Sequence, residues 1–175
     1  MLLTNQQKFL LDVLERLGCV RENQLVSLIR PVFFRRRPDM ASAVVAASMR
    51  QLMGGNFGVR KDGEVFLRRV AKPNPALLEA LDVMLELSSD ALSSYRTGTP
   101  PAILRFCVQE GKSLAAFLVA RYGDDPSRMG MAPEERLILL FDGQGIPNPL
   151  PVPNKQFFAV KLETGKHRFF ALDGS

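Results

Sequence analysis

The sequence has only two cysteines and one histidine among its 175 residues, and this scarcity excludes two kinds of protein. A disulfide framework needs several cysteine pairs, whereas Cys19 and Cys107 both lie in apolar surroundings that are typical of small buried thiols. Because His167 is the single histidine, a zinc site built on a histidine pair is also excluded. We interpret both cysteines as reduced core residues and His167 as a structural residue at a strand edge.

Long hydrophobic runs are missing too, so no segment of the sequence is expected to span a membrane. The beginning of the chain, MLLTNQQKFLLDVLERLG, has neither the basic region nor the small-residue cleavage site of a signal peptide. We find no Gly-rich phosphate loop before a helix and no G-x-S-x-G nucleophile motif. The sequence therefore predicts a cytoplasmic protein that needs no cofactor.

What the sequence does have is an uneven distribution of charge. Hydrophobic residues make up 46% and charged residues 23% of the chain, which is typical of globular proteins. Residues 1–72 carry 13 Lys+Arg against 6 Asp+Glu, whereas residues 73–175 carry 10 against 12. We therefore predict two domains, 1–72 and 73–175, and a polyanionic partner for the first one.

Two helices are predicted in the first thirty residues. Thr4-Asn5-Gln6-Gln7 has the form of a capping box, which satisfies unpaired amide donors at the start of a helix. Apolar residues then recur at helical spacing up to Leu17, and Gly18 is suited to the position just after the helix. A second helix is expected over residues 22–30, and Pro31 is expected to end it because its ring clashes with the preceding turn.

A third helix is expected to begin near Pro38 and to end at Gly54-Gly55. At 100° per residue, one face of it is predicted to face the core and the opposite face to be small and almost uncharged. The core face consists of Ala41, Val45, Ser48 and Leu52 with Met49 at its margin, and the outward face of Asp39, Ala43, Ala46, Ala47 and Arg50.

Residues 57–69 contain two β-prone runs joined by a turn with Asp62-Gly63, which predicts a β-hairpin. Three helices followed by a basic hairpin resemble the winged helix-turn-helix superfamily over residues 4–70. The resemblance rests on Leu14-x-x-Leu17-Gly18-Cys19-Val20, on Gln24-Leu25 and on Leu52-x-x-Gly55. It implies that the third helix enters the major groove of DNA and that the hairpin, or wing, contacts the backbone or minor groove.

The resemblance gives the basic residues of this part a function. The run FFRRRP places three arginines just before the third helix, where its dipole also favours phosphate. The wing adds four cations and the helix one. The predicted DNA-binding residues are Arg35, Arg36, Arg37, Arg50, Arg60, Lys61, Arg68 and Arg69. If roughly five of the seven cations outside the helix neutralise phosphates, log affinity is expected to fall with log salt with a slope of about −4 to −5.

Two alternatives stay open for this part. A run of charges is commonly a solvated surface without a partner. The alanines of the third helix offer almost nothing to read bases apart from Arg50 and Gln51, and they allow another protein surface to approach closely. A protein-interaction module, in which the winged helix holds a partner or a second copy of the chain, is therefore the main alternative to DNA binding.

The second part is predicted to be a small, mainly antiparallel α+β domain. Residues 71–75 form a linker with two prolines, and residues 76–88 have the pattern of a helix buried on more than one side. About five strands follow, at residues 102–108, 114–120, 136–142, 157–162 and 167–172. The whole layout resembles small uncharacterised proteins of bacterial mobile elements and, more distantly, plasmid replication-relaxation proteins. This resemblance implies control of the replication, transfer or transcription of such an element.

Two patterns in the second part could support metal chemistry. Glu110-Gly111-Lys112 has the E-x-K form of restriction-type nucleases, which need a second carboxylate, and Asp90 is the nearby upstream candidate. A hairpin turn is the favoured interpretation of this segment, and a catalytically silent relative of the nuclease fold is also open. Asp124-Asp125 could bind a hard cation, although two carboxylates before a proline commonly form a turn. We expect a protein that is not an enzyme.

Overall fold

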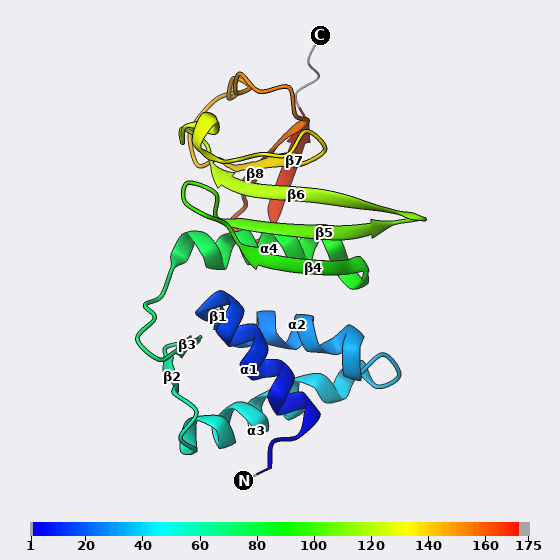
Figure 1. The fold of residues 1–175 in the computed structure, drawn as a ribbon, viewed down its shortest axis with the longest axis vertical. Helices are drawn as coiled ribbons and strands as arrows, with labels where there is room; N and C mark the ends of the chain where they lie inside the picture. Colours follow the sequence, from blue (N-terminus) through cyan, green and yellow to red (C-terminus); the bar gives the residue numbers. More distant parts are fainter. Residues whose placement is uncertain (1, 172–175) are drawn as a thin grey trace. The chain divides into compact units, whose positions relative to one another are not determined.

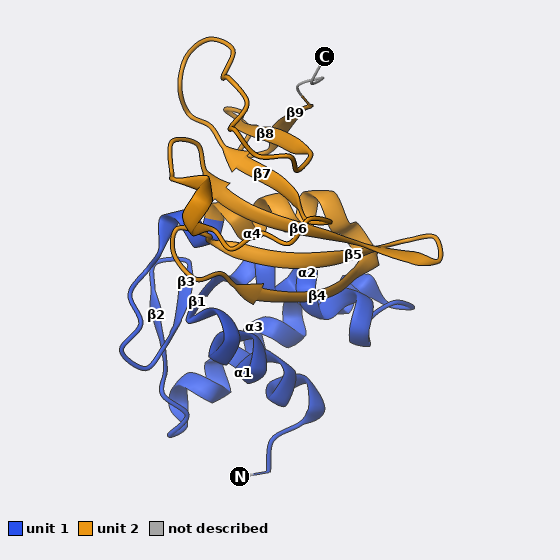
Figure 2. Ribbon diagram, turned by 45° about the horizontal axis from the view of Figure 1, so that its top comes forward, with its two compact units in different colours: residues 1–78 blue, residues 79–175 orange. Residues whose placement is uncertain are grey.

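The computed structural model describes residues 2–171 of the chain. It divides into two compact units, residues 1–78 and 79–175, which are coloured separately in Figure 2. In the described part, helices and two separate β-sheets give an α+β protein, as the sequence predicts. The predicted domain boundary after residue 72 lies just before helix α4 (Pro75–Ser88), and the division between the compact units lies inside that helix.

Helix α1 (Asn5–Leu17) begins and ends where the sequence predicts. The Thr4 hydroxyl accepts the N–H of Gln7 at 3.1 Å, and the Gln7 side-chain oxygen accepts the N–H of Thr4 at 3.0 Å. Gly18 follows the helix with φ 77°, a conformation that costs glycine little, and its N–H donates to the carbonyl of Leu14. Both predicted helix signals are therefore confirmed.

Helix α2 (Glu22–Phe33) is longer than predicted, and the prediction that Pro31 ends it is wrong. Pro31 removes the main-chain hydrogen bond that its own N–H would make and disturbs the turn before it, but the residue that follows the helix keeps its bond. The N–H of Phe34 still donates to the carbonyl of Arg30 at 2.9 Å, and the last residue of the helix packs edge-on against Phe9. These contacts let the helix continue to its observed end.

Helix α3 (Ala41–Gly54) follows a single 3₁₀ turn, η1 (Pro38–Met40), so the α-helix begins one short turn after the predicted start. Its buried face is the predicted one. The buried residues are Ala41, Val45, Ser48, Met49 and Leu52. This face packs α3 in the core of the first unit and leaves the opposite face to solvent.

The first sheet contains the predicted wing and one strand that was not predicted. β2 (Val59–Asp62) and β3 (Val65–Arg68) form an antiparallel hairpin whose turn places Gly63 at φ 59°. The unpredicted strand, β1 (Cys19–Arg21), pairs with the other side of β3, so the order is β1-β3-β2. The wing is therefore anchored to the segment between α1 and α2.

Helix α4 confirms the helix predicted over residues 76–88. It begins after Asn74, whose side-chain oxygen accepts the N–H of Leu77 at 3.2 Å. Apolar residues occupy most of its surface, and the carbonyl of Leu78 accepts a hydrogen bond from the buried side chain of Gln24 at 2.8 Å. Neither this helix nor any other among residues 2–171 has the length and apolarity that crossing a bilayer requires.

The second sheet has six strands in sequential order, one more than predicted, and Figure 2 labels each of them. The additional strand is the half-exposed edge strand β4, which lacks the apolar pattern that reveals the others. Three of the five pairings are antiparallel, and β7 pairs in parallel with both neighbours. The strands are β4 (Leu92–Thr97), β5 (Leu104–Glu110), β6 (Ser113–Arg121), β7 (Arg136–Leu140), β8 (Gln156–Lys161) and β9 (His167–Ala171). The predicted end of the last strand, Leu172, lies outside the described residues.

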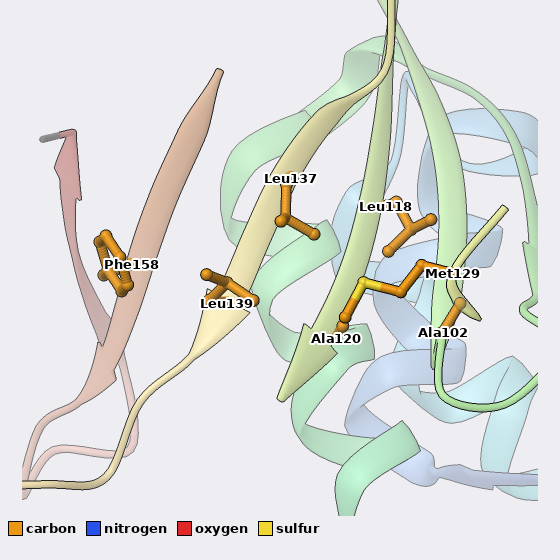
Figure 3. Packing of buried hydrophobic residues seen from close by; sticks show 7 residues of the cluster. All are labelled: Ala102, Leu118, Ala120, Met129, Leu137, Leu139 and Phe158. Carbon is orange, nitrogen blue, oxygen red and sulfur yellow. The ribbon is translucent and has the colours of Figure 1, made fainter. Parts of the chain in front are cut away.

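The core of the second unit that Figure 3 shows lies on one face of this sheet. Its buried members are Ala102, Leu118, Ala120, Met129, Leu137, Leu139 and Phe158. The proline-rich segment 146–153 covers part of the cluster, because Leu150 and Val152 pack against it. The side chain of Gln156 holds this segment in place through both the N–H and the carbonyl of Leu150, each at 2.7 Å.

The two cysteines are expected to differ in reactivity. Burial raises the pKa of the Cys19 thiol, so little nucleophilic thiolate forms there. Cys107 is partly exposed and lines an open hollow of about 330 Å³ on the sheet. We predict that a thiol reagent such as Ellman's reagent titrates one thiol quickly in the native protein and the second only after denaturation. A Cys107→Ser variant should lose the fast phase, and a fast phase that remained in this variant would contradict the assignment.

Candidate nucleic-acid interface

The arginine triplet of the FFRRRP segment lies in the exposed connection between α2 and η1. Nε of Arg35 donates to the carbonyl of Pro31 at 2.7 Å, and Arg37 forms a two-pronged ion pair with Asp39 at 3.2 and 3.3 Å. The side chain of Arg36 makes no hydrogen bond or ion pair within residues 2–171. All three remain exposed, so these local contacts orient the side chains of Arg35 and Arg37 without burying their charge.

The outward face of α3 is as small as the sequence predicts. Ala43 and Ala47 are exposed, and Arg50 extends from the same side without a hydrogen bond or ion pair to the described residues. Gln51 is exposed as well, but its side-chain oxygen accepts a hydrogen bond from the Gln7 amide at 2.6 Å. Bidentate recognition of adenine needs both the oxygen and the nitrogen of an amide side chain. Arg50 therefore keeps all of its donors unengaged within the described residues, whereas the side-chain oxygen of Gln51 is already in use.

The four predicted cations of the wing separate into two pairs. Arg68 and Arg60 satisfy groups of the protein itself. The side chain of Arg68 is only 18% exposed, forms an ion pair with Glu15 at 2.6 Å and donates to the carbonyl of Phe57. Arg60 donates to the carbonyls of Arg69, at 3.1 Å, and Ala71. Arg68 therefore anchors the wing to α1, and Arg60 anchors it to residues 69–71, which follow β3.

The contact between Arg68 and Glu15 also affects the titration of the carboxyl group. The hydrogen bond and the positive charge of Arg68 lower the pKa of Glu15. Because the Glu15 side chain is 61% exposed, water screens this ion pair and it contributes little to the stability of the fold. The ion pair connects α1 with β3 and leaves the side chain of Arg68 largely buried.

The other pair of wing cations points to solvent. Lys61 is exposed and its ammonium group lies 5.0 Å from the centre of the Phe66 ring. Arg69 is exposed, has φ 48°, and its guanidinium makes no hydrogen bond or ion pair with the described residues. It borders an open polar hollow of about 290 Å³ lined by Asn56, Phe57, Gly58, Arg68 and Arg69. This hollow, and Asn56 within it, were not predicted from the sequence.

Of the eight predicted cations, those without an ion pair or hydrogen bond to the described residues therefore lie on α3 and in the segments before and after it. Figure 1 shows the α2–α3 connection at one end of α3 and the wing at the other. A helix of 14 residues is about 21 Å long, and a major groove about 12 Å wide accepts such a helix. We call Arg36, Arg50, Lys61 and Arg69 the free cations. Their arrangement places positive charge on either side of a helix with a small surface.

The candidate metal patterns of the second unit are engaged in other contacts. Glu110, at the end of β5, forms a two-pronged ion pair with Arg136 at 3.0 and 3.3 Å, whereas Lys112 lies in the exposed turn. Asp125 accepts hydrogen bonds from the N–H and hydroxyl of Ser127, which lower its pKa and form a turn. Within residues 2–171, no three His, Cys, Asp or Glu residues are grouped so that they could hold a metal ion.

His167 lies in an environment that its sequence position did not reveal. Its side chain is fully buried on β9, and each ring nitrogen lies 3.0 Å from a carboxylate oxygen of α4. These carboxylates belong to Glu79 and Glu86, 88 and 81 residues earlier in the chain. No local sequence signal could have found a contact over such a separation.

Comparison of the chain with protein-family models, with curated proteins and with solved structures finds no match.

Proposed function

We propose that residues 1–78 form a winged helix that binds duplex DNA mainly through phosphate contacts. The order α1-β1-α2-α3-β2-β3, with the sheet order β1-β3-β2, supports this assignment because the hairpin follows the third helix directly. In this proposal α3 enters the major groove while the wing and the α2–α3 connection contact the two flanking phosphate backbones.

The observation that carries the proposal is the position of the free cations. Arg36 precedes α3, Arg50 projects from it, and Lys61 and Arg69 belong to the wing that follows it. Phosphate binding needs guanidinium or ammonium groups that are not already neutralised, and these groups meet that condition. Because α3 offers little to read base edges apart from Arg50, we propose weak sequence preference and strong dependence on salt.

The proposed biological role follows from the resemblance of the whole layout to proteins of bacterial mobile elements. A DNA-binding unit joined to an α+β unit would regulate the replication, transfer or transcription of such an element. In this proposal the second unit supplies dimerisation or binds a protein partner.

The test is a titration of fluorescent duplex DNA with the full chain at several salt concentrations. We expect log affinity to fall with log salt with a slope of about −4 to −5. Replacing Arg35, Arg36 and Arg37 together with alanine should weaken binding several-fold at low salt and make the slope less steep. Unchanged binding and slope would remove the triplet from the interface.

A second candidate function is protein association through the first unit. The alanine face of α3 favours it, as do three exposed apolar side chains beside the arginine triplet, Val32, Phe33 and Met40. This candidate predicts no DNA binding at about 50 mM salt, where phosphate contacts are strong, together with self-association in analytical ultracentrifugation. The two candidates therefore give opposite results in the DNA titration.

A further inference from the structure

Three side chains of the second unit form a buried contact between α4 and β9. Nδ1 of His167 lies 3.0 Å from Oε1 of Glu86, and Nε2 lies 3.0 Å from Oε1 of Glu79. The main-chain N–H of His167 also donates to Oε2 of Glu86 at 3.0 Å. The imidazole has no exposed surface, and the two carboxylates are about one quarter exposed.

The two contacts of the imidazole ring determine how many hydrogen atoms this cluster needs. A neutral imidazole has one N–H and one nitrogen lone pair, so it can donate to only one of the two carboxylates. The other nitrogen would then direct its lone pair at a carboxylate oxygen 3.0 Å away, which is repulsive. Both contacts are hydrogen bonds only if one further proton is present. That proton lies either on the second ring nitrogen, which makes an imidazolium between two carboxylates, or on one of the two carboxyl groups.

The surrounding charges favour the imidazolium. On α4, Glu79, Asp82 and Glu86 recur at helical spacing on one side, and this helix has no basic residue. On β8, Lys161 is the register partner of His167 and is exposed. Lys166 and Arg168 are the sequence neighbours of His167 and are exposed as well. The ring itself thus faces two acids and no base, so losing its second proton leaves the carboxylates without a buried counter-charge.

We propose that Glu79, His167 and Glu86 form a proton-dependent clasp between α4 and β9. The clasp is closed while His167 carries a hydrogen on both ring nitrogens, and it opens when the imidazole loses one of them. β9 is an edge strand that pairs only with β8, so the clasp supplies side-chain hydrogen bonds that tie this strand to the helix.

Opening the clasp has a consequence beyond the strand itself. Phe169, two residues after His167 on the same face of β9, lines an apolar hollow of about 240 Å³ together with Leu87 of α4 and Phe157 of β8. When β9 loosens, this hollow loses one wall. The proton therefore controls how firmly β9 holds the Phe169 wall of this hollow.

The clasp can be tested directly because His167 is the only histidine in the chain. In ¹⁵N NMR of the full chain, the single imidazole should show hydrogen on both ring nitrogens wherever the β9 amides are protected from exchange. As the imidazole loses that proton at higher pH, hydrogen-exchange protection of the β9 amides should fall about tenfold relative to that of the β5 amides. A neutral imidazole in a protein whose β9 amides are still protected would overturn the proposal.

A Glu79→Gln substitution gives the sharpest comparison. The amide group that this substitution introduces can donate to the lone pair of a neutral imidazole, so the variant should keep its β9 protection at the pH where the wild type loses it. Glu163→Gln is the matched control, because it removes the same charge from the exposed turn between β8 and β9 and should behave like the wild type. Equal loss of protection in all three proteins, or in none, would show that no clasp operates. The wild-type NMR titration decides the question even if Glu79→Gln does not fold.

Discussion

Replacing the four free cations Arg36, Arg50, Lys61 and Arg69 together with glutamate is expected to abolish detectable DNA binding at about 200 mM salt. Each of these side chains is exposed and makes no hydrogen bond or ion pair within the described residues, so it can neutralise a phosphate. If each neutralises one phosphate, the slope of log affinity against log salt becomes less steep by about 3.6. Reversing the charge adds repulsion to this loss.

The same substitutions should leave the fold almost unchanged. Substitutions of exposed side chains usually change the free energy of unfolding by less than about 0.5 kcal/mol each. The contact of Lys61 with the Phe66 ring adds a loss of about 0.5 to 1 kcal/mol. Far-ultraviolet circular dichroism reports on the helices, three of which (α1, α2 and α3) belong to the first unit. Its transition during urea unfolding should remain cooperative.

A matched control removes the effect of total charge. Lys112, Arg121, Arg128 and Lys155 are exposed cations of the second unit, and replacing them with glutamate changes the net charge by the same amount. This control should bind DNA nearly as well as the wild type. If both quadruple variants lose binding equally, the attraction comes from overall charge and the proposed surface on α3 and the wing is wrong.

The distinction between free and engaged cations could not be drawn from the sequence. In the sequence alone, the arginines of FFRRRP and the cations of the wing cannot be distinguished, and all of them were predicted to bind DNA. Arg68 is engaged because the fold brings it against Glu15, 53 residues away. Gln51 is similarly engaged with Gln7 over 44 residues. Local patterns indicate which residues carry charge, whereas tertiary contacts decide which charges remain available.

The helices and strands show the same contrast between local sequence signals and contacts with distant parts of the chain. The capping box at Thr4 and the turn at Asp62-Gly63 act within four residues, and both were predicted. β1 has three residues and exists because β3 pairs with it, and β4 is a largely exposed edge strand with few apolar residues. Neither strand has a strong signal of its own, since its formation depends on a partner elsewhere in the chain.

In the second unit, the largest expected loss of stability comes from Phe158→Ala. Phe158 is 1% exposed and lies in the core cluster of Figure 3, where Tyr122 and Phe141 meet its ring at centroid distances of 5.8 and 6.4 Å. Truncation removes buried apolar surface and leaves a cavity, and such substitutions cost about 3–5 kcal/mol. The free energy of unfolding should therefore fall by about this amount.

The chain provides both a control and a probe for this experiment. Phe170 is the register partner of Phe158 on β9 but is 44% exposed, so Phe170→Ala removes the same atoms with an expected cost of about 1 kcal/mol. The protein has no tryptophan and two tyrosines, Tyr95 and Tyr122, and both belong to the second unit. Tyrosine fluorescence during urea unfolding therefore follows this unit alone.

The size of the Phe158→Ala effect will show how rigid the covering segment is. One side of the cavity is formed by Leu139 on β7, which the sheet holds in place, and the cluster is covered by Leu150 and Val152 of the proline-rich segment. If that segment can move inward, the cavity partly closes and the loss lies near about 3 kcal/mol; if Gln156 holds it fixed, the loss approaches about 5 kcal/mol. Adding Gln156→Ala to both backgrounds separates these cases, because releasing the segment should cost less in the Phe158→Ala protein than in the wild type. Equal effects of Phe158→Ala and Phe170→Ala would instead place the stabilising core of the second unit elsewhere.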